Sequence, residues 1–227
     1  MILESILALP SVVAVVWAGI PGQESGNGLA DILYGSTSPS GKLPFTIAKA
    51  ATDYGTAVVP ADDSYAEGLF IDYRHFDKSA IVPRYEFGFG LSYTTFAYSN
   101  LSISPLSTAP PTAGIAPGGL KSLYDIVATV SATITNNGTV AGAEVAQLYV
   151  SLPTSSAVPA SPARQLRGFD KLSLKPGDSG TVVFQLRRKD LSFWDAASKS
   201  WVLPKGAFGV VVGASSRDGR LSGVLGA

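Results

Sequence analysis

The chain has 227 residues, of which 46% are hydrophobic and 15% charged, so it can build the core of one large or two small domains. Its 17 basic and 17 acidic side chains cancel, which argues against the positive field that nucleic-acid binding needs. The absence of cysteine excludes disulfides and thiolate sites, and His75 is the single histidine. We therefore expect no metal, no cofactor and no nucleic-acid partner.

The N-terminal segment has the pattern of a helix followed by a strand. Residues 2–8 resemble the end of a helix that stops before Pro10, and the β-branched run at 12–17 predicts a strand buried on both faces of a parallel sheet. The uncharged stretch around this run has prolines within it and no basic residue before Lys42. We therefore expect neither a signal peptide nor a membrane helix in this chain.

A second helix and strand follow a glycine-rich loop. The apolar spacing of residues 29–33 predicts a short helix to about Tyr34, with Gly35 as its C-cap. Residues 43–47 are the next predicted strand, and residues 69–73 are predicted to be extended. Together these elements indicate an incomplete α/β layer structure.

From about Tyr93 the hydrophobic period changes to two, as in antiparallel strands with one buried face. The residues predicted to face the core are Ile126, Ala128, Val130, Ala132, Ile134, Ala146, Leu148, Val150, Val182, Phe184, Leu186, Phe208, Val210 and Val212. With 96–103 and 172–174 there are about seven strands, which predicts an antiparallel, immunoglobulin-like β-sandwich.

Three further expectations concern this sandwich. Asn137-Gly138 is either a hairpin turn or a crossing between the two sheets, and the spacing does not decide between them. Residues 104–120 are predicted to form a loop. Gln147 and Tyr149 are predicted to face a domain interface or solvent, because they alternate with core positions.

Several longer stretches, in their order along the chain, carry a family resemblance. They read WAGIPGQESG, LADILYG and PSGKLP between 17 and 44, EGLFIDYRHFD at 67–77 and YEFGFGLSYTTF at 85–96. These resemble the C-terminal part of a fungal-type glycoside hydrolase family 3 β-glucosidase. The later stretches GAEVAQLYV, QLRGF and LKPG are similar to the fibronectin type III-like domain of that family.

The resemblance implies a mixed α+β chain with three parts. These are the end of an α/β sandwich domain at 1–60, a connector at 61–94 and a fibronectin type III-like β-sandwich at 95–227. It implies a secreted parent enzyme that hydrolyses terminal β-D-glucosyl residues by a retaining mechanism. The remainder of that enzyme, the expected partner, supplies a barrel with the Asp nucleophile and a loop with the acid/base Glu. No catalytic residue of the family maps onto this chain.

Two other functions are open to the chain. One is a non-catalytic β-sandwich module that binds a carbohydrate or a protein partner. The other is an independent hydrolase that uses His75, which a single histidine makes a weak hypothesis. The upstream coding sequence would discriminate the first from a β-glucosidase.

Two glutamates are candidates for the catalytic carboxyl groups of a glycosidase. Retaining enzymes need two carboxyl groups about 5–5.5 Å apart. Glu24 lies between glycines after the first predicted strand, and we interpret it as a partner of loop amides or of the next helix N-terminus. Glu67 precedes Leu69 and Phe70, which indicate a buried strand rather than an acid/base loop.

Asp72, Arg74, His75 and Asp77 form the densest polar cluster. A histidine between carboxylates can act as a general base, with Ser92 as the formal nucleophile. The sequence around Ser92 lacks the second glycine of a nucleophile elbow. We therefore interpret the cluster as hydrogen-bonded ion pairs that fix a connector between domains.

Two features lie near the C-terminal end. The basic run at 187–189 is interpreted as a solvated strand edge rather than a polyanion site. Phe193, Trp194 and Trp201 are interpreted as sandwich packing against a hairpin, with stacking on a sugar ring as the alternative. Asn100 and Asn137 begin N-glycosylation sequons, which matter if the parent enzyme is secreted.

Overall fold

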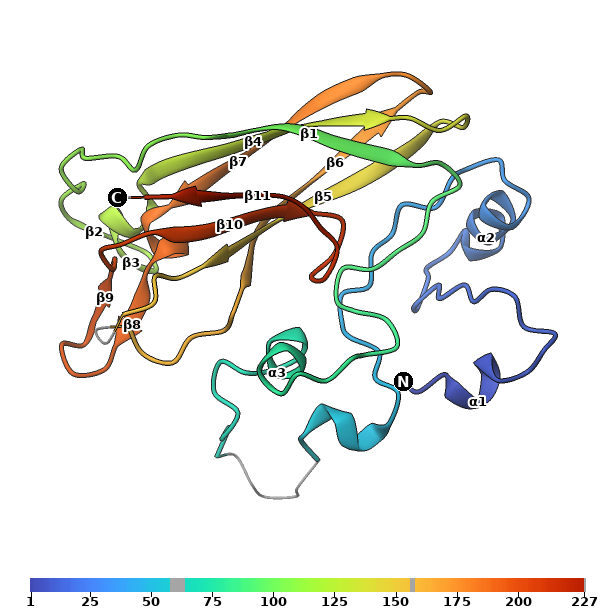
Figure 1. The fold of residues 1–227 in the computed structure, drawn as a ribbon, viewed down its shortest axis with the longest axis horizontal. Coiled ribbons are helices and arrows are strands. Elements are labelled where there is room, and N and C mark those ends of the chain that lie inside the picture. Colours follow the sequence, from blue (N-terminus) through green and yellow to red (C-terminus); the bar gives the residue numbers. More distant parts are fainter. Residues whose placement is uncertain (58–63, 156–157, 227) are drawn as a thin grey trace.

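The computed structural model describes residues 1–57, 64–155 and 158–226. Its largest part is a two-layer β-sandwich. Residues 1–35 lie toward one end of the sandwich, and residues 64–80 lie along its side (Figure 1). The predicted boundary between 60 and 61 lies outside the described residues, so the three domain limits stay predictions.

The sandwich consists of one three-stranded and one four-stranded antiparallel sheet (Figure 1). The first has the order β1-β4-β7, with β1 at Phe96–Ile103, β4 at Ile126–Asn136 and β7 at Ser179–Arg187. The second has the order β11-β10-β5-β6, with β5 at Gly142–Ser151, β6 at Gln165–Leu174, β10 at Phe208–Gly213 and β11 at Gly219–Leu225. The predicted antiparallel sandwich is confirmed.

The core lies between the two sheets and contains most of the residues predicted to face it. Ile126 is the exception, because 46% of its surface is exposed while Val127 is buried. The register of β4 against β7 shifts between Ile126 and Ala128. At such a bulge two successive residues can face the same side, here Val127 and Ala128, so the predicted alternation begins at Ala128.

The loop after β4 crosses from the first sheet to the second, so Asn137-Gly138 is not a hairpin turn. The buried side chain of Asn136 holds this loop. Its Nδ2 donates to the carbonyls of Val140 and Leu174, at 2.8 and 3.0 Å, and its Oδ1 accepts from the Thr94 hydroxyl at 2.6 Å. A buried amide with all these partners fixes the crossing.

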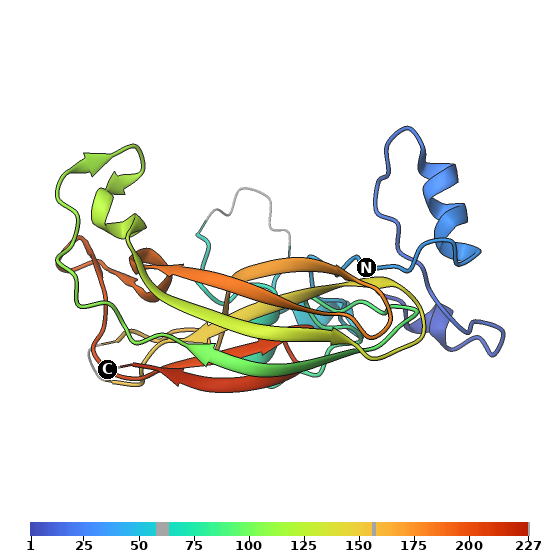
Figure 2. The ribbon, with the colours of Figure 1, turned by 90° about the horizontal axis from the view of Figure 1, so that it is seen from above.

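Two short hairpins and two 3₁₀ turns lie in the loops between the strands of the sandwich. The predicted loop at 104–120 contains a small hairpin of β2 (Ile115–Ala116) and β3 (Gly119–Leu120), followed by the 3₁₀ turn η2 (Lys121–Tyr124). A second hairpin of β8 (Phe193–Asp195) and β9 (Ser200–Val202) follows the 3₁₀ turn η3 (Arg188–Leu191). Both hairpins lie at the end of the sandwich away from α2 (Figures 1 and 2).

The N-terminal third contains α1 (Glu4–Leu7), α2 (Ser25–Leu33), the 3₁₀ turn η1 (Ala51–Tyr54) and α3 (Tyr73–Lys78). The predicted end of α2 is confirmed, because Gly35 follows it with φ of +80°. None of the helices in the described ranges has the length and hydrophobicity of a membrane span. Figure 2 shows α2 projecting away from the sandwich.

The predicted strand at 12–17 is wrong for this chain. These residues have no regular secondary structure, and 95% of the surface of Val13 is exposed. A strand needs a neighbour for its backbone hydrogen bonds, and no strand described in residues 1–57 or 64–93 pairs with this segment. The β-branched composition indicates strand propensity but supplies no partner.

Two other extended predictions also fail in detail. Residues 43–47 form no strand and meet residues 85–89 through an isolated antiparallel bridge between Ile47 and Tyr85. The segment at 69–73 is not extended and buried, since Leu69 is exposed and Tyr73 already begins α3. Asp72, with φ of +51°, turns the chain and accepts a hydrogen bond from the Tyr73 N–H, which starts the helix there.

Candidate functional site

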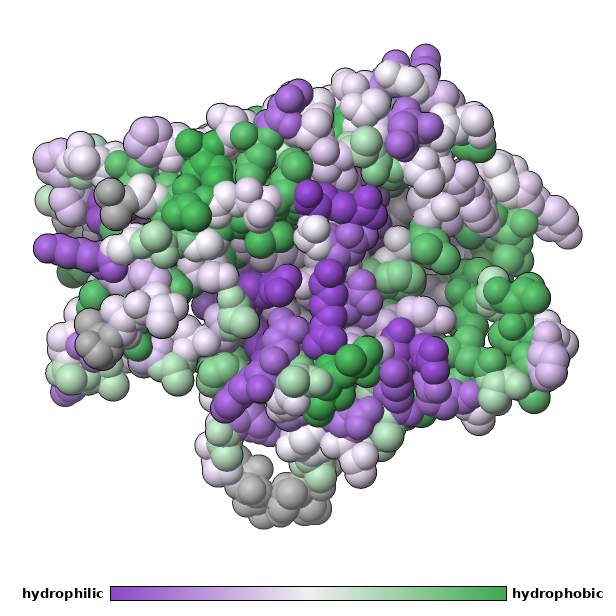
Figure 3. Space-filling view, viewed as in Figure 1, coloured by the Kyte–Doolittle hydropathy of each residue, from purple (hydrophilic) through white to green (hydrophobic). Residues whose placement is uncertain are grey.

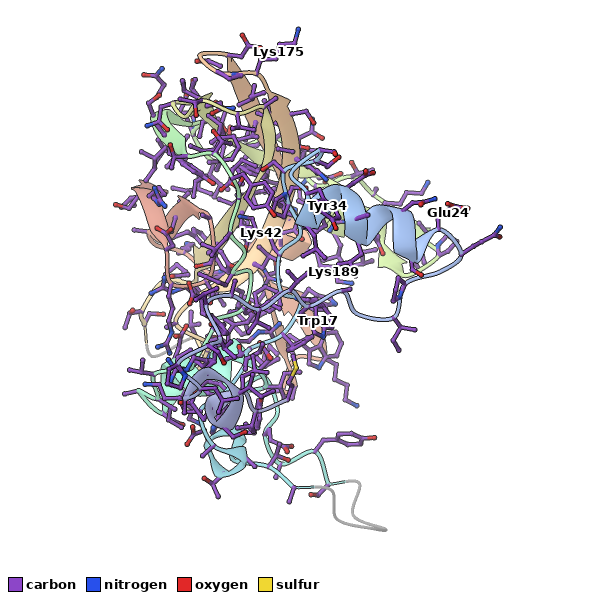
Figure 4. All side chains as sticks on the ribbon, turned by 90° about the vertical axis from the view of Figure 1, so that its right-hand side faces the viewer. Trp17, Glu24, Tyr34, Lys42, Lys175 and Lys189 are labelled. Carbon is purple, nitrogen blue, oxygen red and sulfur yellow. The ribbon has the colours of Figure 1, made fainter. Side chains whose placement is uncertain are left out.

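Of the two carboxylates that are glycosidase candidates, Glu24 is exposed and Glu67 is half-buried. Glu24 is exposed at the outer end of α2 (Figure 4) and accepts a hydrogen bond from Asn27 Nδ2 at 2.6 Å, not from the backbone amides that we expected. The Glu67 carboxylate accepts from the Thr56 hydroxyl at 2.7 Å, and Leu69 beside it is exposed rather than part of a buried strand. Neither contact gives a carboxyl group the apolar surroundings of a proton donor.

The polar cluster at 72–77 is divided among separate partners. Asp72 accepts hydrogen bonds from the backbone N–H and hydroxyl of Thr46, both at 2.9 Å. His75 Nε2 lies 3.0 Å from the carbonyl oxygen of Asp53, whereas the Ser92 hydroxyl contacts the Ser38 hydroxyl. The described contacts therefore do not join histidine and serine in a nucleophile–base pair.

Asp77 carries the ion pairs of the cluster. Its carboxylate lies 3.1 Å from Arg217 and 3.9 Å from Arg164, two arginines of the β-sandwich. Arg217 also donates to the carbonyl oxygen of Ile81 at 2.8 Å. These contacts join α3 and the loop after it to the sandwich, which is the structural role that we expected for the cluster.

A larger set of contacts forms what we call the junction, in which residues 38–46 and 72–93 meet β1, β5, β6 and the loop at 214–217. Lys42 Nζ lies 3.2 Å from the Glu144 carboxylate, which also accepts from the Tyr98 hydroxyl at 2.7 Å. The Lys42 and Glu144 side chains are only 11% and 5% exposed. Burial and the Glu144 charge raise the pKa of Tyr98, so this phenol stays a donor.

Gln147 is the second anchor of the junction. Its Nε2 donates to the carbonyls of Gly88 and Ala214, at 3.0 and 2.7 Å, and its Oε1 accepts from the Tyr149 hydroxyl at 2.6 Å. Gln147 and Tyr149 are both buried, so of the two predicted alternatives, a domain interface or solvent, they do not face solvent. A glutamine at the centre of an apolar strand was the sequence signal for this contact.

Tyr73 is a junction residue that the sequence did not single out. Its hydroxyl oxygen accepts a hydrogen bond from the Leu166 N–H at 3.0 Å. Its ring lies 4.8 Å from Phe87 and 6.1 Å from Tyr149, measured between ring centroids. The aromatic residue that begins α3 thus contacts both β5 and β6.

Substitution of Gly88 by alanine should weaken the junction. A Cβ atom there would lie 2.2 Å from Gln147 Oε1, and the backbone φ is +82°. We expect the free energy of unfolding to fall by more than the ~1–3 kcal/mol of backbone strain alone, measured in urea. Gly177→Ala is the matched control, because Gly177 has φ of +83° and no atom within 4 Å of the new Cβ. Equal losses of unfolding free energy in Gly88→Ala and Gly177→Ala would mean that the contact between Gln147 and Gly88 does not contribute to stability.

The sequence predicts that the tryptophans pack in the sandwich against a hairpin. They do lie on a hairpin, formed by β8 and β9, but they are not part of the sandwich core. Trp194 and Trp201 face each other across the β8–β9 hairpin with ring centroids 5.9 Å apart, and they are 51% and 38% exposed. The hairpin is a two-stranded sheet of its own, separate from the two sheets of the sandwich. In the basic run, Arg187 is exposed and pairs with Asp190, as expected of a strand edge.

Both sequon asparagines are exposed. Asn100 lies in a bulge of β1 with φ of +52°, and Asn137 lies in the loop that crosses between the sheets. Within residues 1–57, 64–155 and 158–226, no three His, Asp or Glu side chains gather in a possible metal site.

Comparisons with known proteins connect these features to a family. Residues 1–93 match the model of the glycosyl hydrolase family 3 C-terminal domain, and residues 144–216 match that of the fibronectin type III-like domain. The chain is 63% identical over 222 residues to β-glucosidase cel3A of Pyricularia oryzae, a match of 97% of this chain and 31% of that protein.

The chain is also similar to solved structures of fungal β-glucosidases. β-Glucosidase D2-BGL of Chaetomella raphigera is 68% identical with a TM-score of 0.96, and the β-D-glucoside glucohydrolase of Trichoderma reesei is 60% identical with a TM-score of 0.94. Each match covers 100% of this chain and 32% of the solved chain. The chain thus spans about a third of the length of these relatives. It belongs to glycosyl hydrolase family 3 and corresponds to the C-terminal part of the fungal β-glucosidases.

Proposed function

We propose that this chain is the non-catalytic C-terminal part of a β-glucosidase that hydrolyses terminal β-D-glucosyl residues with retention. In this role the chain supports the catalytic parts of the enzyme and contributes no reacting carboxylate. The observation that carries the proposal is the exposed apolar segment at residues 12–20. It occurs in a chain that matches about a third of the length of each larger β-glucosidase with high identity.

The exposed apolar segment supports a partner within the same enzyme. Val13 and Ile20 are almost fully exposed, and the Trp17 ring lies perpendicular to the Phe45 ring with the ring centroids 5.0 Å apart. Leu29 and Leu33 of α2 are also exposed. Figure 3 shows hydrophobic side chains gathered on the N-terminal part of the molecule, at the right of the view. A contiguous apolar patch of this kind is typical of a surface that another protein part covers.

The junction supports the mechanical part of the proposal. Lys42 with Glu144, Gln147 with Gly88 and Tyr73 with Leu166 connect the two parts of the chain through buried polar groups. Buried hydrogen bonds with defined partners fix one relative orientation better than apolar contact alone. The sandwich can therefore hold residues 38–46 and 72–93 in a fixed position relative to itself.

The proposal extends to the setting of the enzyme. We propose that the parent enzyme is extracellular and that Asn100 and Asn137 carry N-linked glycans. Exposure of both asparagines supports this, because the modifying enzyme needs access to the side-chain amide. Peptide mass spectrometry of the enzyme secreted by its source organism should find hexosamine on both peptides. Unmodified asparagine at both positions would contradict this part.

An aryl-glucoside assay tests the absence of a catalytic role. Purified chain should release no p-nitrophenol from p-nitrophenyl β-glucoside above a mock purification, because the proposal assigns the nucleophile and the acid/base to the rest of the enzyme. Glu24→Gln and Glu67→Gln are the controls. Turnover that either substitution abolishes would contradict the proposal, whereas turnover that both leave unchanged would identify a contaminating glycosidase.

A further inference from the structure

A cavity of about 600 Å³ opens where α3, β6, η3 and the β8–β9 hairpin meet. It brings together two features that are separate in the sequence, the basic run at 187–189 and the two tryptophans. Arg74 of α3 and Arg167 of β6 also line it. Its volume is in the range of small-ligand sites, and it is lined by aromatic faces next to charged groups.

The cavity has an excess of positive charge. Asp190 lines it but is held by Arg187, whose Nε and Nη2 lie 3.0 and 3.1 Å from the two carboxylate oxygens. Arg74, Arg167 and Lys189 line the same cavity, and in the part of the chain that the structure describes none of them lies within 4.0 Å of a carboxylate. Three cations therefore line one space, and the carboxylate that lines it with them, Asp190, is paired with Arg187.

The two unpaired arginines are partly buried. Arg167 donates to Gln165 Oε1 at 3.0 Å, and Arg74 Nη1 to the carbonyl oxygen of Leu69 at a long 3.4 Å. Arg74 Nε is buried and has no hydrogen-bond partner. Burial lowers the pKa of Arg167, Asp190 opposes the shift, and the charges of Arg74 and Arg187 lower it further. A bound anion would stabilise a guanidinium group in such surroundings.

The tryptophans give the cavity its second chemical character. About half of the Trp194 surface is exposed, while Lys189 Nζ lies 5.1 Å from the centre of the Trp201 ring. An exposed indole face packs against flat, weakly polar surfaces such as the C–H face of a pyranose ring. The planar guanidinium fork of an arginine matches a carboxylate in two parallel hydrogen bonds.

We propose that this cavity binds a carboxylate-bearing sugar, the uronic acid unit of an acidic oligosaccharide. The carboxylate lies between Arg74 and Arg167, with Lys189 adding charge, and the sugar ring packs against Trp194. An inorganic anion would use the cations but not the indole, and a neutral sugar would leave the cations unpaired. The inference does not depend on the proposed glycosidase role.

Calorimetric titration of the full chain with trigalacturonate tests this site, with its methyl ester and inorganic phosphate as comparison probes. We expect the acid to bind at least tenfold more tightly than the ester, which has the same rings without the charge. Arg167→Met should weaken acid binding at least tenfold. Trp194→Ala should weaken binding of trigalacturonate and leave phosphate binding unchanged. Lys175→Met, in an exposed turn far from the cavity (Figure 4), should change neither affinity.

Several results would overturn the proposal. Equal binding of acid and ester would mean a neutral-sugar site. Phosphate binding as tight as trigalacturonate binding, unchanged in Trp194→Ala, would mean an anion site without sugar recognition. Binding of none of the probes would refute the site itself. If circular dichroism shows that Arg167→Met does not fold, Lys189→Met serves in its place, and unchanged acid affinity in that variant would also contradict the proposal.

Discussion

Substitution of Glu144 by glutamine should lower the free energy of unfolding by about 3–5 kcal/mol, because it leaves the Lys42 ammonium in the junction without its counter-charge. The side chain keeps its size, and its oxygen can still accept from the Tyr98 hydroxyl, which lies 2.7 Å from the carboxylate in the native chain. The loss therefore reports the charge and not a cavity. Urea unfolding followed by tryptophan fluorescence measures it.

Glu4→Gln is the matched control for this experiment. Glu4 pairs with Arg84, but their side chains are 36% and 35% exposed, so water replaces the lost contact and the loss should be much smaller. The double variant Lys42→Met, Glu144→Gln should recover part of the stability, since no unpaired charge stays buried. A small and equal loss for Glu144→Gln and Glu4→Gln would mean that water reaches Lys42.

Leu148→Ala should cost about 2–5 kcal/mol of unfolding free energy, as truncation of a buried leucine does. Leu148 has no exposed surface, and its strand, β5, is a central strand of the four-stranded sheet. It pairs with Gly168 on β6 and Val212 on β10, so neighbouring backbone cannot easily move in to fill the cavity. The midpoint and slope of urea unfolding give this value.

Val224→Ala is the control for the core substitution, because Val224 is an aliphatic residue on β11 with 66% of its surface exposed. The loss of unfolding free energy in this variant should stay within about 0.5 kcal/mol.

Gln147→Ala should lower the free energy of unfolding by about 1–3 kcal/mol, since it removes the partner of buried polar groups in the junction. A loss of unfolding free energy in Leu148→Ala as small as that in Val224→Ala would mean that Leu148 is exposed and that the register of β5 is shifted by one residue.

Strands whose two faces differ were predictable from sequence. Alternation in β4, β5, β7 and β10 marked their core faces, because one side packs against the other sheet. β11 was missed because its glycines, Gly219 and Gly223, interrupt the apolar alternation. Residues 12–17 were misjudged for the opposite reason, since their strand propensity is strong but no described strand pairs with them.

The junction and the cavity were only partly predictable. Gln147 signalled an interface by its position in an apolar strand, but its partner Gly88 lies 59 residues away in sequence. The basic run and the tryptophans were visible, yet nothing local indicated that they share a cavity with Arg74 and Arg167. Contacts between distant segments arise from the tertiary fold, which local patterns do not encode.

Co-expression with the remaining two thirds of a relative tests the central claim most directly. The part of the Trichoderma reesei enzyme that precedes its matched region is suitable, because the two chains are 60% identical over this whole chain. We predict that the two pieces co-purify and together hydrolyse p-nitrophenyl β-glucoside, while neither does so alone. Val13→Asp should reduce both association and activity, since Val13 lies in the uncovered apolar segment. Full activity of the remaining piece without this chain, or no association of the two, would contradict the account.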